Sequence, residues 1–252
     1  MFRRRFRSRH ARAPRPMPRR TLAFIVFALA VAVGCVRLGF WQLARLGERR
    51  ARNAAITHRM DAPPVSWDEA TRDSARARFR RVQLTGRYDY TRELVLTSRG
   101  RNGAPGVYVL TPLAVSGMPA VLVNRGWAYA ADGMTVDLAK WHEGDTATVV
   151  GFLDDFVPAY GMVSTPSQSR GVRHLVRDSI EQRLGERVAP FLVVQRLGSE
   201  PTDSITHLVR VDPPPMDEGS HRSYAIQWFA FAIIAVVGAT AVARTRRPVA
   251  ER

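Results

Sequence analysis

The stretch HRSYAIQWFAFAIIAVVGATAVA, residues 221–243, decides how this chain of 252 residues is organised. From Tyr224 to Ala243 it holds twenty consecutive residues without a charge. At about 1.5 Å rise per residue, a helix of that length measures about 30 Å, which matches the hydrocarbon thickness of a bilayer. We therefore predict a transmembrane helix over residues 223–243.

The polar side chains of this stretch gather at its beginning. At about 100° per residue, His221, Tyr224, Ala225 and Trp228 share one stripe of the helix. The small Ala225 leaves a gap among larger neighbours, where a flat ligand could lie. In the alternative reading, the aromatic residues anchor the helix at the membrane interface and His221 is solvated.

A second apolar stretch, residues 21–46, predicts a first transmembrane helix. Arg37, Trp41 and Arg45 recur every four residues at its outer end and therefore share a face. Two guanidinium groups beside an indole could hold a planar ligand through its carboxylates, because guanidinium pairs with carboxylate through two hydrogen bonds. The alternative is that both arginines snorkel to the lipid headgroups.

Basic residues are concentrated at the two ends of the chain. Residues 1–20 carry nine arginines and no acid, and residues 244–252 carry four arginines against one glutamate. Basic tails outside two apolar helices predict that both termini are cytoplasmic. The Arg-rich start brings no folded module or aromatic platform for nucleic acid, so we predict no nucleic-acid binding.

Residues 47–222 are predicted to form one β-rich domain outside the cytoplasm. Turns containing Gly and Pro separate its strand signals, a pattern typical of a mostly antiparallel sheet or barrel. Apolar residues at helical spacing over 174–186 predict one amphipathic helix packed on that sheet. The strand signals cover residues 79–90, 93–98, 107–115, 120–130, 146–153, 191–197 and 205–211.

The sequence contains no recognisable catalytic motif. His142, His174 and His207 are scattered, without the spacing of metal ligands. No nucleophile elbow, phosphate-binding loop or dinucleotide fingerprint is found. The single cysteine, Cys35, falls within the first apolar stretch, so no Cys-x-x-Cys pair can hold a metal or a covalent haem. We predict that the chain is not an enzyme, and an enzyme tethered by two helices is the weaker alternative.

Four segments, in their order and with this two-helix layout, resemble the surfeit locus protein family of cytochrome c oxidase assembly factors. They are GFWQLARLGERR (39–50), APGVYVLTPL (104–113), VLVNRGW (121–127) and HRSYAIQWF (221–229). The sequence departs from the family where Gly219-Ser220 precede His221 in place of the common asparagines. It also has three prolines at 213–215 where the family usually has a Gly-rich run.

The resemblance implies a bacterial plasma-membrane protein that helps to insert haem a into the oxidase. The resemblance to bacterial relatives further implies haem binding through a histidine at the head of the second helix, the place of His221. Imidazole would then ligate the iron while guanidinium groups meet the propionates. The predicted haem a site comprises His221 as the iron ligand, with Tyr224, Trp228, Arg37, Trp41 and Arg45.

The implied partners are the catalytic subunit of the oxidase, an enzyme of haem a synthesis, and the lipid bilayer. An alternative within the same resemblance is a membrane scaffold that binds no cofactor and stabilises an oxidase subunit during assembly. A Soret absorbance band on the purified protein would separate the two.

Overall fold

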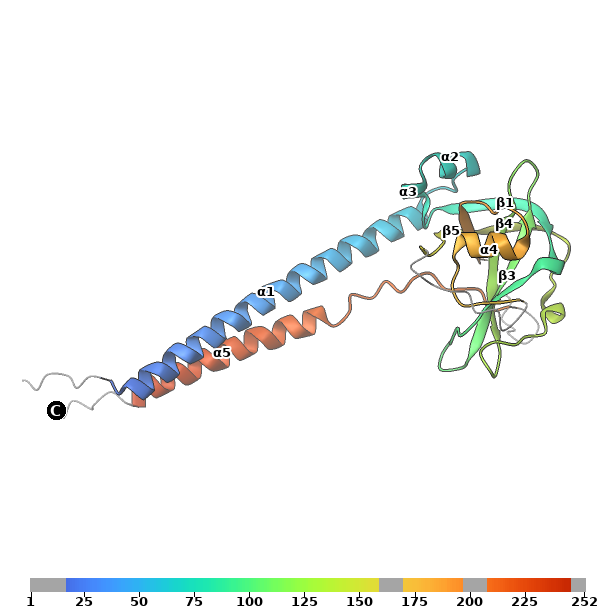
Figure 1. The fold of residues 1–252 in the computed structure, drawn as a ribbon. Coiled ribbons are helices and arrows are strands. Elements are labelled where there is room, and N and C mark those ends of the chain that lie inside the picture. The colour runs from blue at the N-terminus through green and yellow to red at the C-terminus, as the bar shows by residue number, and fades with distance from the viewer. Residues whose placement is uncertain (1–16, 159–169, 197–207, 246–252) are drawn as a thin grey trace, which may run out of the picture. The chain divides into compact units, whose positions relative to one another are not determined.

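The computed structural model describes residues 17–158, 170–196 and 208–245. It divides into two compact units, shown in Figure 1. The first, which we call the helix pair, comprises Met1–Asn53 and Asp217–Arg252. The second, the sheet domain, comprises Ala54–Met216. Most of the two predicted basic tails lies outside the described residues.

The helix pair is built from α1, Arg19–Asp61, and α5, His221–Thr245. Both helices are long and apolar enough to cross a membrane, judged by length and composition. The predicted spans 21–46 and 223–243 fall within them. Phe27 and Val33 on α1, and Ile233 and Ile234 on α5, are exposed large apolar side chains. Such an outward-facing apolar surface suits lipid rather than water.

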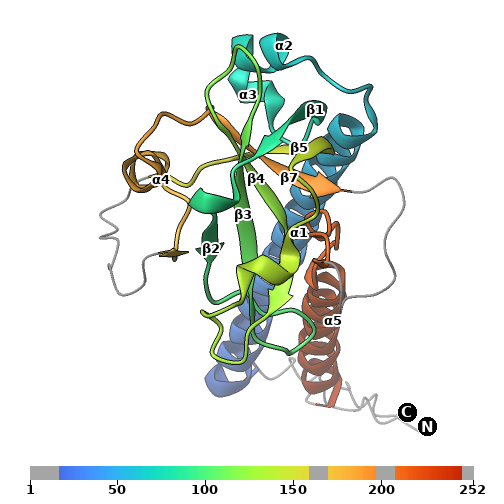
Figure 2. The same ribbon diagram turned by 90° about the vertical axis from the view of Figure 1, so that its right-hand side faces the viewer.

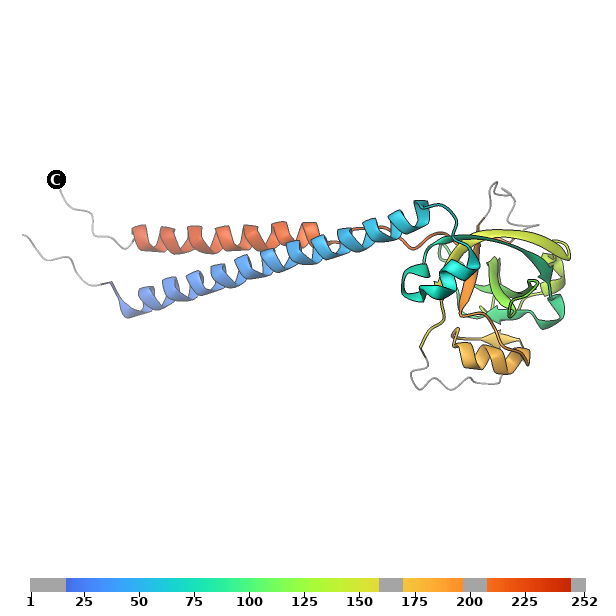
Figure 3. The ribbon, with the colours of Figure 1, turned by 90° about the horizontal axis from the view of Figure 1, so that it is seen from above.

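The two helices pack against each other through small side chains. Figures 1 and 3 show α5 beside α1 and antiparallel to it, so Arg19 and Thr245 lie at one end of the pair. From Ala28 to Leu46 the buried α1 positions alternate in steps of four and three, and those of α5 recur every seven, which is a heptad pattern. Small residues at such positions let helix backbones approach closely. This helix seam consists of Ala28, Ala32, Cys35, Gly39, Gln42, Leu46, Ala225, Ala232 and Ala239.

The seam corrects one expectation about the second helix. Ala225 is only 1% exposed, so its surface is covered inside the protein and offers no gap for a flat ligand. The reason is its position seven residues before Ala232, which places both methyl groups on the face that meets α1.

We expect Gly39→Leu to loosen the helix seam. A Cβ atom at Gly39 would come within 2.7 Å of the partly exposed Phe229 ring, so a larger side chain must displace that ring from its place beside Gly39. Such overpacking costs about 1–3 kcal/mol. A destabilisation of about 1.4 kcal/mol raises the fraction of molecules with a loosened seam tenfold. Cys35, which is buried in the seam, should therefore react about tenfold faster with N-ethylmaleimide in detergent.

Gly34→Leu is the matched control for this prediction. No atom lies within 4 Å of a Cβ built at Gly34, so this variant should leave the reactivity of Cys35 unchanged. Equal rates in the two variants would contradict the seam.

The sheet domain contains one seven-stranded sheet in the order β1-β5-β7-β4-β3-β2-β6 (Figure 2). Because β1 also pairs with β3, the strands β1, β5, β7, β4 and β3 close into a ring. The strands span Arg81–Tyr88 (β1), Leu94–Leu96 (β2), Gly106–Ala114 (β3), Val121–Tyr129 (β4), Thr146–Asp155 (β5), Gly171–Val172 (β6) and Phe191–Arg196 (β7).

The prediction of a mostly antiparallel sheet is wrong, because the sheet is mixed. β4 pairs with β7 in parallel, and so does β2 with β6. A ring of five strands cannot alternate in direction all the way round, so at least one of its pairs must be parallel. Here that pair is β4 and β7, since each of them is antiparallel to its other neighbour in the ring.

Most of the predicted elements are confirmed. The amphipathic helix is α4, Arg177–Leu184, and its Ile180 and Leu184 pack in one buried cluster with Leu122 and Leu192. In the predicted strand 205–211, residues 205–207 lie outside the described part and Val209 forms a single bridge with Trp127. Shorter helices complete the domain: α2 Trp67–Arg72, α3 Ser74–Ala77, η1 Tyr90–Arg92 and η2 Leu138–Trp141.

Gly126, on β4, shows why the motif VLVNRGW needs its glycine. Its φ of 143° is one that side-chain-bearing residues rarely adopt. A Cβ atom there would also lie 2.6 Å from the carbonyl oxygen of Val209. The glycine therefore allows the segment around Val209 to lie against β4.

Candidate functional site

The predicted iron ligand, His221, is the first residue of α5 and is partly exposed. Its Nδ1 lies 2.8 Å from Oε1 of Gln42 on α1, across the helix seam. An amide oxygen can only accept a hydrogen bond, so Nδ1 is the donor and carries a proton. In the neutral ring, the lone pair of Nε2 is then available to a metal.

Two ion pairs hold the residues just before α5 against α1. Arg49 donates from Nη2 to Oδ1 of Asp217 at 3.2 Å. Arg50 donates from Nε and Nη2 to the two carboxylate oxygens of Glu218, at 2.7 and 2.8 Å. These side-chain hydrogen bonds lower the pKa of Asp217 and of Glu218 below their ordinary values. Both pairs are solvent-exposed, so they orient the chain before His221 more than they stabilise it.

The predicted stripe of Arg37, Trp41 and Arg45 is exposed along α1. At about 100° per residue, these positions lie about 140°, 100° and 60° around the helix from Gln42. Arg45 forms an ion pair with Glu48 at 2.7 Å. The structure thus brings Gln42, rather than the stripe, to His221, and the arginine clamp stays a prediction.

The aromatic members of the predicted site lie in different surroundings. Tyr224 is exposed, so its ring is accessible three positions after His221 at the start of α5. Trp228 is half-buried and packs against the buried cluster that Ala32 and Cys35 of α1 form with Ala232 of α5. Trp228 therefore contributes to the contact between the helices, whereas Tyr224 and Trp41 present free faces.

Sequence reasoning did not single out Gln42. Its signal is visible in retrospect as an uncharged polar residue seven positions after Cys35, on a face otherwise made of small and apolar residues. Polar side chains on such faces commonly hydrogen-bond across helices. Finding its partner needs the tertiary structure, because His221 is 179 positions away in the chain.

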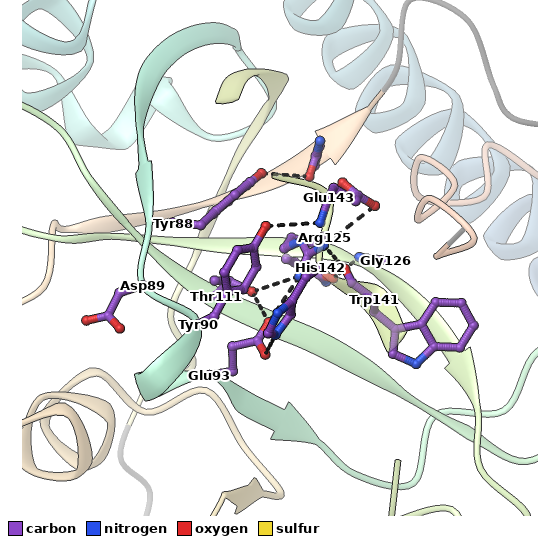
Figure 4. A network of polar contacts seen from close by, with 12 residues as sticks. Tyr88, Asp89, Tyr90, Glu93, Thr111, Arg125, Gly126, Trp141, His142 and Glu143 are labelled. Atoms are coloured by element: carbon purple, nitrogen blue, oxygen red, sulfur yellow. Dashed lines mark hydrogen bonds and ion pairs between the residues drawn. The ribbon is translucent and has the colours of Figure 1, made fainter. Parts of the chain in front are cut away.

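A second group of polar side chains lies inside the sheet domain (Figure 4). Glu93, which precedes β2, and Arg125, on β4, have fully buried side chains. Nη1 of Arg125 donates to Oε1 of Glu93 at 3.0 Å, and the Thr111 hydroxyl donates to the same oxygen at 2.7 Å. The other carboxylate oxygen of Glu93 lies 3.3 Å from Nε2 of His142.

Further contacts extend this buried network toward the surface. The His142 ring stacks on Tyr90, with the ring centroids 3.9 Å apart. Arg210 donates to the carboxylate of Glu143 at 2.9 Å and also to the backbone carbonyl of Arg125. Burial raises the pKa of Tyr90, and raises that of the neighbouring Tyr88 further.

The network is balanced in charge, because Arg125 and Arg210 face Glu93 and Glu143. Among the described residues, no group of three or more His, Cys, Asp or Glu is placed to hold a metal ion. The network ties together residues from η1, β3, β4 and the segment after η2, so its evident role is to fix their positions. A sequence signal does exist, since Asn124 and Arg125 interrupt an otherwise mostly apolar strand.

The class of protein follows from these two units: a pair of apolar helices at the two ends of the chain, with a mixed β domain between them in sequence. The sequence matches the SURF1 family over residues 29–233, and the chain belongs to that family. Members of the family are known generally as assembly factors of cytochrome oxidase rather than as enzymes.

Individual relatives come from bacteria and eukaryotes. An uncharacterised SURF1-like protein of Mycobacterium tuberculosis is 29% identical over 235 residues, covering 86% of this chain and 80% of the relative. A SURF1-like protein of Rickettsia felis is 24% identical over 215 residues, covering 80% and 88%. Surfeit locus protein 1 of Takifugu rubripes is 27% identical over 117 residues, covering 40% and 49%.

Proposed function

We propose that this protein is a membrane-bound assembly factor that holds haem a at the outer end of its helix pair and passes it to the catalytic subunit of cytochrome c oxidase. The observation that carries the proposal is the state of His221. Its Nδ1 is engaged by Gln42 and its Nε2 has the lone pair that iron requires. Family membership supports the oxidase as the recipient.

The surroundings of His221 suit a cargo that must later be released. One imidazole supplies a single axial ligand, and the exposed faces of Tyr224 and Trp41 provide aromatic surface for a macrocycle. Arg45, about 60° around α1 from Gln42, is the nearest arginine of the stripe for a propionate. Contact of haem with the bilayer would cover the hydrocarbon tail.

The absorbance spectrum of the purified protein tests this proposal. Protein from cells that produce haem a should carry a Soret band, and protein from cells unable to make haem a should not. A colourless protein from haem-a-producing cells would favour the cofactor-free scaffold. The scaffold also agrees with the tight seam at Ala225, which leaves no cleft between the helices there.

We further propose that both helices cross a bacterial plasma membrane with both termini in the cytoplasm. Antiparallel packing places Arg19 and Thr245 at the same end of the pair, and basic residues flank that end in the sequence. Reporters fused after Arg252 and within the turn at 98–106 should therefore report the cytoplasm and the exterior, respectively. The reverse pattern would exclude this topology.

A further inference from the structure

We infer that Gln42 is a positioning residue, which holds the imidazole of His221 in the tautomer whose Nε2 binds iron. The inference rests on the proposed haem-binding function and adds to it a residue that does not itself touch haem. It also predicts which ring nitrogen is the ligand. Metal-binding histidines commonly donate their second N–H group to a nearby oxygen, which fixes the tautomer and the ring orientation.

Gln42 is held more firmly by its surroundings than His221, as a positioning role requires. Gln42 is 9% exposed and lies in the seam between Gly39 and Leu46, so its amide has little freedom. His221 is partly exposed at the first turn of α5, where a side chain would otherwise rotate freely. The 2.8 Å hydrogen bond from Nδ1 therefore fixes the ring against the more rigid helix.

The tautomer matters because a solvated histidine prefers its proton on Nε2. In that form the nitrogen that faces away from the backbone has no lone pair for a metal. A hydrogen bond from Nδ1 to an amide oxygen reverses the preference and leaves the lone pair on Nε2. Within the part of the chain that the structure describes, Nε2 of His221 donates or accepts no hydrogen bond.

Gly219 keeps the approach to Nε2 open. Its φ of 66° lies in the left-handed region that favours glycine. A Cβ atom at this position would lie 3.6 Å from Cδ2 and 3.8 Å from Nε2 of His221, so a longer side chain would cover that edge of the ring. The Asp217 carboxylate accepts a hydrogen bond from the Gly219 amide at 2.9 Å and from Arg49, which stabilises the turn.

Nitrogen NMR of the haem-free protein tests the tautomer directly. Full-length protein with ¹⁵N-labelled histidine would be measured in detergent at about pH 8, where an ordinary histidine is neutral. The His221 signal is assigned by its loss in His221→Ala. Wild type should show the proton on Nδ1, and Gln42→Leu should move it to Nε2. Gln227→Leu, which changes an exposed glutamine of α5, is the matched control and should leave the tautomer unchanged.

Titration with haem a supplies the second readout. Gln42→Leu should raise the Kd about 10–100-fold, the usual effect of removing a partner behind a metal ligand. Gln42→Glu keeps an oxygen acceptor and should bind haem a at least as tightly as wild type. Gln227→Leu should bind as wild type does.

Each outcome bears on a different statement. An unchanged tautomer in Gln42→Leu overturns the positioning role. A changed tautomer with an unchanged affinity for haem a overturns it too. The haem-binding proposal survives both outcomes. If wild type binds no haem a while the tautomer still responds to Gln42, the proposed function fails. The hydrogen bond is then only a contact between helices, and the inference fails with it.

Discussion

Arg125→Met is expected to lower the free energy of unfolding of the sheet domain by about 3–5 kcal/mol, the usual result of removing one partner of a buried ion pair. The side chains of Arg125 and Glu93 are both fully buried. Without the guanidinium group, the Glu93 carboxylate keeps the Thr111 hydroxyl and His142 as partners but loses the charge that offsets its desolvation. The backbone carbonyl of Trp141 also loses its donor.

Unfolding of the full-length protein in detergent, followed by near-ultraviolet circular dichroism, measures this effect. Arg87→Met is the control, because the Arg87–Asp145 pair is exposed at 73% and 70% and should contribute about 0–1 kcal/mol. The double variant Glu93→Gln/Arg125→Met removes both charges and should be more stable than Arg125→Met alone. A loss as small as that of the control would show that the network does not support the domain.

His221→Ala is expected to abolish the Soret band of protein purified from haem-a-producing cells. Iron would lose the imidazole, which is the axial ligand that the proposal assigns to it. Expression and membrane insertion should be unchanged, because one partly exposed side chain contributes little to stability. The haem content of the oxidase in the same cells should fall in parallel.

His174→Ala is the control for this substitution, since His174 is an exposed histidine of the sheet domain. That variant should retain the full band. A full Soret band in His221→Ala would instead return His221 to the role of a solvated residue at the end of a helix. The scaffold function would then be the better account of the protein.

The predicted elements were recognisable because each depends on local sequence. Strands β1, β2, β4 and β7 lie within predicted segments, and β3 and β5 extend beyond theirs by one or two residues. In these segments, side-chain preferences and turn residues act over a few positions. β6 was missed because its two residues, Gly171 and Val172, carry no pattern. The directions of the strands could not be predicted, because they follow from the closure of a ring of five.

The candidate site likewise combines features that local sequence predicts with contacts that depend on how the helices pack. His221 and Tyr224 could be selected from one short stretch, since helical periodicity places them on one stripe. Periodicity shows which residues share a face of one helix, but it does not show which face meets another helix. It therefore could not tell whether the arginine stripe of α1 lies beside His221 and Tyr224 of α5. The small residues of the seam determine which face of α1 meets α5, and that face carries Gln42 to His221.

The amino-acid sequence is sufficient to predict the two apolar helices, the β-rich character of the domain between them and membership of the family, because these depend on composition and on residues close together in the chain. The contacts between distant residues become visible only in the folded protein. Folding buried Arg125 with Glu93, 32 positions apart, and joined Gln42 to His221, 179 positions apart. Such pairs form because a buried polar group must find a partner wherever packing places it, and packing is set by the whole chain.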